Sequence, residues 1–167
     1  FEYMSHSYMT RLSEARPDVA LPFGGTRYET NILVEIAATA PRDALADDSG
    51  EVPLTRLLQE TLATLMEEGA VLDAEIAQTE AQRRAMWQRR ELAAEITVAR
   101  QPTIDTDICQ PLDKVAVFLD RIQARLPAYD AGAETLSIAH LGDGNIHFTV
   151  FPTRDDATLS DAVVEAV

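Results

Sequence analysis

The sequence predicts an α+β domain in which a mainly antiparallel sheet carries helices on one face. Segments that alternate like strands are separated by single amphipathic segments, and the last two expected strands, 135–141 and 145–151, are joined by Gly142-Asp143-Gly144. Strand–helix–strand units that close in a hairpin are typical of a ferredoxin-like fold, here a duplicated and partly truncated unit. An α/β fold with a parallel sheet is the alternative.

Glycine and proline set the boundaries of the first elements. We expect a helix over 1–14, followed by a loop at Gly24-Gly25. Residues 28–37 are rich in β-branched and aromatic side chains, which predicts a buried strand. The acidic stretch 41–51 is expected to be a loop.

A first long helix is expected to begin at Pro53, because proline suits the first turn of a helix. Leucines recur at helical spacing up to Gly69, which supplies a stop. Residues 71–78 then alternate as a strand.

A capping box formed by Thr79 and Gln82 opens a second long helix over 80–99. The remaining expected elements are a strand over 103–110, a helix that Pro111 starts, the two hairpin strands and a helix over 159–167.

The charge balance excludes several classes of partner. The 167 residues carry a formal net charge of −14, so the surface repels nucleic acid and anionic membrane surfaces. No apolar stretch approaches the roughly 20 residues that span a bilayer, and we expect a soluble, cytoplasmic protein. The single cysteine, Cys109, is expected to be a packing residue. The chain starts without methionine and stops inside an expected helix, which suggests a piece of a longer protein.

Two of the three histidines are expected to meet across the hairpin. If Asp143 and Gly144 form a two-residue type I′ turn, His140 faces His147 on one side of the sheet. The other side then carries an apolar core face. Two imidazoles at this spacing can bind one divalent metal such as zinc, manganese or iron.

The histidine pair has a simpler interpretation, as two side chains on a solvated sheet face. A protein metal site usually takes at least three protein ligands, and the hairpin provides two. Asp143 is a candidate third ligand, but turn chemistry explains its position more simply. His6 is expected to be an exposed residue of the opening helix.

Four of the fourteen basic residues lie together on the second long helix. Arg83, Trp87 and Arg90 share one face there, and a guanidinium group can bind a substrate carboxylate through two parallel hydrogen bonds. The alternative is a solvated charged face, with Trp87 turned to the core and Arg90 paired with a carboxylate of the chain.

Several segments, taken in order, resemble the C-terminal domain of the FAD-linked oxidase family. This family includes D-lactate dehydrogenases, glycolate oxidase subunits and D-2-hydroxyglutarate dehydrogenases. The most specific segment is His140-Leu141-Gly142-Asp143-Gly144-Asn145-Ile146-His147. The others are Phe1-Glu2-Tyr3-Met4, residues 28–35, Asp73-Ala74-Glu75-Ile76-Ala77, Trp87-x-x-Arg90-Glu91 and Asp107-Ile108-Cys109-Gln110-Pro111.

The resemblance implies a role in oxidising a D-2-hydroxy acid to a 2-oxo acid, with hydride transfer to FAD. The chain would be the substrate domain, and a separate FAD-binding domain would precede residue 1. His140 and His147 would bind a divalent metal, together with a glutamate further along the chain. Arg90, Asn145 and Thr149 would bind the substrate, and the histidine that takes the hydroxyl proton would lie downstream.

Two departures from the family pattern affect the expected substrate. D-2-hydroxyglutarate dehydrogenases tend to have lysine where this chain has Asp105, and asparagine where it has Thr149. Another 2-hydroxy acid is therefore expected to fit at least as well. Two alternatives to a flavin-dependent dehydrogenase are a self-contained metal hydrolase and a non-catalytic ligand-binding or dimerisation module. A homodimer is among the expected partners of the chain.

Overall fold

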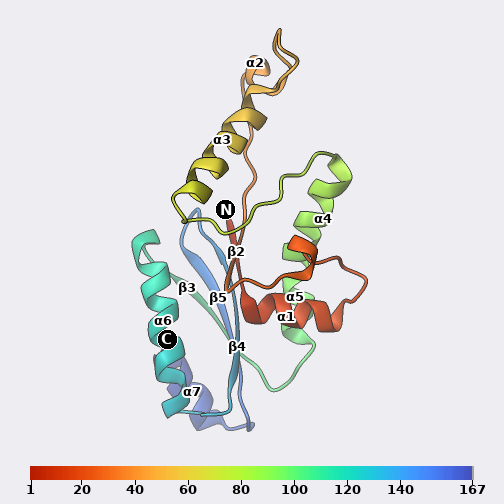
Figure 1. Cartoon of the computed structure of the whole chain (residues 1–167). Helices are drawn as coiled ribbons and strands as arrows, with labels where there is room; N and C mark the ends of the chain where they lie inside the picture. The colour runs from red at the N-terminus through yellow and green to blue at the C-terminus, as the bar shows by residue number, and fades with distance from the viewer. Residues whose placement is uncertain (167) are drawn as a thin grey trace.

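The computed structural model describes residues 1–166 and contains one antiparallel sheet of five strands in the order β2-β1-β4-β5-β3. The predicted α+β class is therefore confirmed (Figure 1). The strands are β1 (Glu2–Ser5), β2 (Thr30–Leu33), β3 (Ile104–Cys109), β4 (Glu134–His140) and β5 (Asn145–Phe151).

One face of the sheet packs against α6 (Val115–Arg125) and α7 (Ala157–Ala166). Side chains of β4 and β5 alternate in direction, so that every second residue contributes to this core. The fully buried members of this core are Ala139, Ile146 and Phe148, and Val150 is almost fully buried. Both helices lie on the same side of the sheet in Figure 1.

The opposite face is also covered, by α1 (His6–Ala15) and α5 (Ala93–Val98). The expectation of helices on a single face is therefore wrong for the sheet as a whole. The physical reason is that the alternate residues of β4 and β5 are apolar too at the end distant from the hairpin turn. These residues are Leu136, Ile138 and Phe151, which pack against Tyr8, Leu12 and Ile96.

The segment β3–α6–β4–β5–α7 has the connectivity of a ferredoxin-like unit. Its strands lie in the order β4-β5-β3, and both of its helices cover one face. Residues 1–103 add β1 and β2 to the β4 side of this sheet and form no second unit of that kind. Because residues 1–166 contain a single unit of this kind, the predicted duplication stays a prediction.

The chain begins with a strand, not with the expected helix. Residues of β1 pair with β2 on one side and with β4 on the other, and Ser5 then caps α1 by accepting a hydrogen bond from the backbone N–H of Tyr8. A strand of four residues carries little local signal, because its partner β4 lies more than 130 residues away in sequence.

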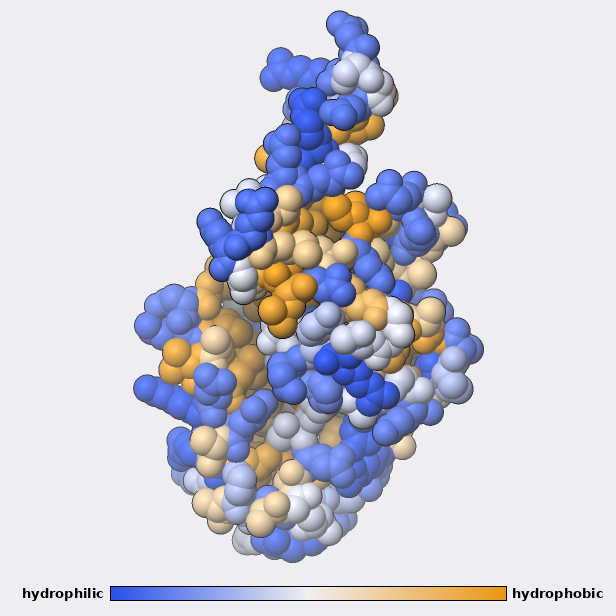
Figure 2. Space-filling view, viewed as in Figure 1, coloured by the Kyte–Doolittle hydropathy of each residue, from blue (hydrophilic) through white to orange (hydrophobic). Residues whose placement is uncertain are grey.

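The middle of the chain projects from the sheet. α2 (Pro41–Ala44), within the expected acidic loop, and α3 (Pro53–Glu67) extend away from the strands (Figure 1). The predicted helix start at Pro53 and stop at Gly69, whose φ is +72°, are confirmed. No strand forms over 71–78, so that expectation is wrong. These residues instead line an apolar groove with α3 and β2, where hydrophobic residues gather on the face shown in Figure 2.

The second long helix consists of two helices, α4 (Glu80–Glu91) and α5, which Leu92 separates. The predicted capping box is present: Thr79 accepts from the N–H of Gln82, whose side chain accepts from the N–H of Thr79. The other predicted elements of the second half are confirmed with small shifts in their ends, and Val167 lies outside the described residues.

The hairpin turn is longer than predicted. His140 pairs with Asn145, which leaves a turn of four residues between them. A type I′ turn needs positive φ at both central residues, and here only Gly144 has it, at +75°. The side chain of Asp143 instead accepts a hydrogen bond from the N–H of Asn145 at 3.0 Å. The direct pairing of His140 with His147 is therefore wrong.

Among residues 1–166, no helix is long and apolar enough to cross a membrane.

Candidate functional site

The two hairpin histidines lie side by side on the α1/α5 face of the sheet, although they do not pair directly. His140 is opposite Asn145 and His147 is opposite Ile138, so both histidines still project from the same face. Their ring centroids are 5.3 Å apart and the rings are nearly perpendicular, at 80°. The structure thus brings the predicted pair together through a diagonal contact.

Each imidazole is held at Nδ1 by a carboxylate from a neighbouring strand. His140 Nδ1 lies 2.8 Å from Oε2 of Glu2, which β1 places opposite it. His147 Nδ1 contacts Oδ1 of Asp107, its pairing partner on β3. A ring that donates Nδ1–H to a carboxylate keeps its lone pair on Nε2, the arrangement usual for metal-ligating histidines.

The residues present therefore fit a divalent metal in their chemistry, but they supply only two ligands. Among residues 1–166, no group of three or more histidine, cysteine, aspartate or glutamate side chains is arranged to hold a metal ion. A third ligand would have to come from outside these residues.

Arg90 on α4 completes the cluster around His140. Its Nε donates to Oε2 of Glu2 at 2.7 Å, and its Nη2 lies 3.2 Å from Nε2 of His140. Burial of the Glu2 carboxyl tends to raise its pKa, but the hydrogen bonds from His140 and Arg90 outweigh burial, so the pKa of Glu2 is lowered. The Glu2 carboxylate is therefore anionic, and it holds the side chains of Arg90 and His140 in place.

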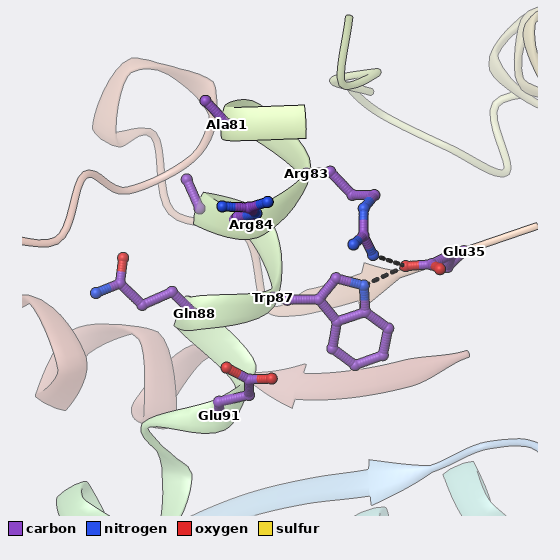
Figure 3. Close-up of a pocket in the computed structure, with 8 residues that line it drawn as sticks. Glu35, Ala81, Arg83, Arg84, Trp87, Gln88 and Glu91 are labelled. Carbon is purple, nitrogen blue, oxygen red and sulfur yellow. Dashed lines mark hydrogen bonds and ion pairs between the residues drawn. The ribbon is translucent and has the colours of Figure 1, made fainter. Parts of the chain in front are cut away.

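The other arginines of α4 point elsewhere. Arg83 and Trp87 both donate to Glu35 in a shallow, open pocket, as the dashed lines in Figure 3 show. Arg84 pairs with Glu80, and Arg89 donates to the carbonyl oxygen of Ala20. Of the alternative interpretation, the pairing of Arg90 with a carboxylate is found, with Glu2, whereas Trp87 does not turn to the core; of this basic cluster Arg90 alone reaches the histidines.

A cleft of about 320 Å³ lies beside these residues, between α5 and the strands β3 and β5; we call it the α5 cleft. Its polar lining includes Arg90, His147, Thr149, Asp105 and Asp107. Its apolar lining comes from Ala93, Ala94, Val98 and Ile138. The cleft thus joins a guanidinium group, an imidazole and two carboxylates in a space that suits a small polar molecule.

The two other residues predicted to bind the substrate, Thr149 and Asn145, and the third histidine, His6, differ in their surroundings. Thr149 is buried and its hydroxyl donates to Oδ1 of Asp105. Asn145 projects from the same face, and its buried Oδ1 has no hydrogen-bond partner among the described residues. His6 lies apart on α1, 3.9 Å from Glu29.

Glu2, Asp105 and Asp107 were not predicted as site residues. The alternation of Asp105 and Asp107 with Ile104, Thr106 and Ile108 carries a usable signal, because it places both carboxylates on one face of β3. Glu2 carries no comparable local signal, since its role depends on the long-range pairing of β1 with β4.

Comparison with known proteins shows which family the chain belongs to. The family "FAD linked oxidases, C-terminal domain" matches residues 46–167. D-2-hydroxyglutarate dehydrogenase of Stutzerimonas stutzeri (strain A1501) is 29% identical over 153 residues, which are 90% of this chain and 29% of that protein. A probable mitochondrial D-2-hydroxyglutarate dehydrogenase of Oryza sativa subsp. indica is 27% identical over 92% of this chain and 25% of its own length.

A third relative, D-2-hydroxyglutarate dehydrogenase of Xanthomonas citri pv. viticola, is 34% identical over 57% of this chain and 20% of its own length. The chain thus spans less than a third of the length of each of these relatives. Because the family match covers well over half of the chain, the chain belongs to the C-terminal domain family of the FAD linked oxidases.

Proposed function

We propose that the complete protein is an FAD-dependent dehydrogenase that oxidises a D-2-hydroxy acid to a 2-oxo acid, and that this chain binds the substrate. One observation carries the proposal: two imidazoles, each with Nδ1 on a carboxylate, lie beside Arg90 at the edge of the α5 cleft in a member of this family.

Arg90 is the residue that we assign to the substrate carboxylate. Its Nε is occupied by Glu2 and its Nη2 contacts Nε2 of His140, whereas its Nη1 has no hydrogen-bond partner among the described residues. A guanidinium group stays charged at all working pH values and suits the flat carboxylate group. The hydroxyl oxygen of Thr149 is an acceptor in the lining of the cleft, and the buried Oδ1 of Asn145, which has no partner among the described residues, lies two residues from His147 on β5.

His140 and His147 would hold a divalent metal, such as zinc, manganese or iron, through their Nε2 atoms, and for His140 the metal would replace the contact with Nη2 of Arg90. The bound metal supplies a Lewis acid for the substrate hydroxyl, and FAD, bound mainly outside these residues, supplies the hydride acceptor. Glu2 and Asp107 keep the two rings in the tautomer that presents Nε2.

The relatives are named for 2-hydroxyglutarate, but we do not assign that substrate to this chain. Asp105 and Thr149 line the α5 cleft where a second substrate carboxylate would lie, and neither is a cation. The cytoplasmic location and the homodimer expected from the sequence stay predictions, as does the absence of a nucleic-acid partner.

The test uses the complete protein encoded by the gene, purified with FAD. Metal content is measured by mass spectrometry, and flavin reduction is followed by absorbance with a panel of D-2-hydroxy acids. We expect the double variant His140→Ala/His147→Ala to lose the metal and to reduce flavin at least about 100-fold more slowly. His6→Ala, which removes the histidine outside the cluster, should change neither value.

Two results would contradict the proposal. If the complete protein holds FAD but no metal, the role of the histidine pair is wrong while the dehydrogenase activity stands. If it binds no flavin, the chain is a ligand-binding or dimerisation module instead.

A further inference from the structure

The two ends of the α5 cleft carry opposite charges. Arg90 lies at the end next to His140, and Asp105 lies on β3 at the other end, bonded to Thr149. Building on the proposed function, we infer that Asp105 and Thr149 form a subsite for the tail of the substrate. This subsite selects a 2-hydroxy acid whose tail carries a hydrogen-bond donor, a hydroxyl or an ammonium group, over one whose tail carries a second carboxylate.

Strand register places this subsite in line with the histidines. Thr149 is two residues beyond His147 on β5, and Asp105 is two residues from Asp107 on β3. Alternate residues of a strand share one face at a spacing of about 7 Å, so the tail subsite lies one such step beyond His147. A short carbon chain, held at its carboxylate end by Arg90, covers that step.

Hydrogen bonding leaves only acceptors at the subsite. The hydroxyl hydrogen of Thr149 is used in the bond to Oδ1 of Asp105, and the remaining oxygen of the Asp105 carboxylate has no other partner within residues 1–166. Neither group can donate a hydrogen bond to an incoming carboxylate. A hydroxyl or an ammonium group supplies the missing donor.

Charge favours the same choice of tail. Apart from the His147 imidazole, Arg90 is the one cationic residue in the lining of the cleft that the described residues form, and Asp105 and Asp107 are two anions. Once Arg90 holds the first carboxylate, a second one lies among like charges, which lowers its affinity. The apolar residues Ala93, Ala94 and Ile138 admit the carbon chain without opposing either kind of tail.

The test compares D-2-hydroxy acids of equal chain length that end in a methyl, hydroxyl, ammonium or carboxylate group. Flavin reduction is measured in the complete protein with FAD. We expect kcat/KM for the hydroxyl or the ammonium tail to exceed that for the carboxylate tail by about 10- to 100-fold. Asp105→Lys should reverse this order, because it places a cation at the subsite.

Two further variants separate the effect of charge at the subsite from the effect of charge elsewhere and from that of the acceptor oxygen. Asp120→Lys makes the same charge change on the exposed side of α6, on the other face of the sheet, and should keep the wild-type order. Asp105→Asn keeps an acceptor oxygen but removes the charge, so it should reduce the preference for ammonium more than that for hydroxyl.

Failure of the subsite is distinguishable from failure of the proposed function. Flavin reduction by all four acids with similar kcat/KM, or an order that Asp105→Lys leaves unchanged, would overturn the subsite alone. No flavin reduction by any of the acids would overturn both.

Discussion

Gly144 shows how one residue fixes the geometry of the hairpin that carries both histidines. Its φ is +75°, and a Cβ atom added there would lie 1.9 Å from the carbonyl oxygen of Gln110. The carbonyl oxygen of Gly144 also accepts a hydrogen bond from the N–H of Gln110 at 3.0 Å, which ties the turn to the end of β3. This close backbone contact is available only to glycine.

We therefore expect Gly144→Ala to destabilise the chain by about 2 kcal/mol or more, from left-handed backbone strain and the clash with Gln110. Gly142→Ala is the matched control, because its φ is not positive and no atom lies within 4 Å of its added Cβ. Urea unfolding of both variants gives the comparison. Equal stability of the two would show that the turn does not depend on this contact.

At the scale of single elements, α4 depends on its first turn. The capping box of Thr79 and Gln82 satisfies backbone N–H groups that the helix itself leaves free. α4 is strongly polar and buries no residue completely, so packing contributes less to it than to α1 or α6.

Thr79→Ala should lower the free energy of unfolding by about 1 kcal/mol, because it removes the N-cap acceptor. Thr61→Ala, at an exposed position inside α3, should be neutral or slightly stabilising, since alanine has the higher helix propensity. Denaturant midpoints measure both. A larger loss for Thr61→Ala than for Thr79→Ala would contradict the role of the cap.

Elements with strong local patterns were predictable from the sequence, whereas elements that depend on distant partners were not. The leucine repeat of α3, the cap of α4 and the alternation in β3, β4 and β5 are all local signals. β1 was missed because its partners β2 and β4 hold it extended. Residues 71–78 alternate without forming a strand, since they line the groove beside α3 and pair with no other strand of the described sheet.

The residues of the candidate site also divide into those that carry a local sequence signal and those that depend on distant partners. His140 and His147 share one face of the sheet, as expected. The change from a two-residue to a four-residue turn shifts the pairing by two residues, and such a shift does not move a side chain to the other face. Arg90 and Thr149 both line the α5 cleft, and the roles of all these residues stay predictions. Glu2 could not be placed, because only the assembled sheet brings it to His140.

For the whole molecule, electrostatics opposes the compact state. The chain has 28 acidic and 14 basic residues, and its net charge of −14 repels itself when folded. Most of its ion pairs are exposed, and such pairs contribute little each. Repulsion therefore outweighs pairing over the surface as a whole.

Added salt should consequently stabilise the chain. Raising the ionic strength from about 0.01 M to about 0.15 M shortens the Debye length from about 30 Å to about 8 Å, which screens the repulsion. We expect the melting temperature, followed by circular dichroism, to rise over this range with sodium chloride and equally with potassium chloride. A fall in melting temperature would show that the surface ion pairs dominate instead.

The exposed position of Asp105 on β3 has a consequence for how substrate range can change during evolution. Strand pairing between β3 and β5 uses backbone groups, and the side chain at this position is not part of either core. An exchange at position 105 is therefore expected to leave both cores intact, and its main cost in folding is the hydrogen bond from the buried hydroxyl of Thr149. Such a position lets a lineage acquire a new substrate in a single step, and it offers a natural starting point for engineering.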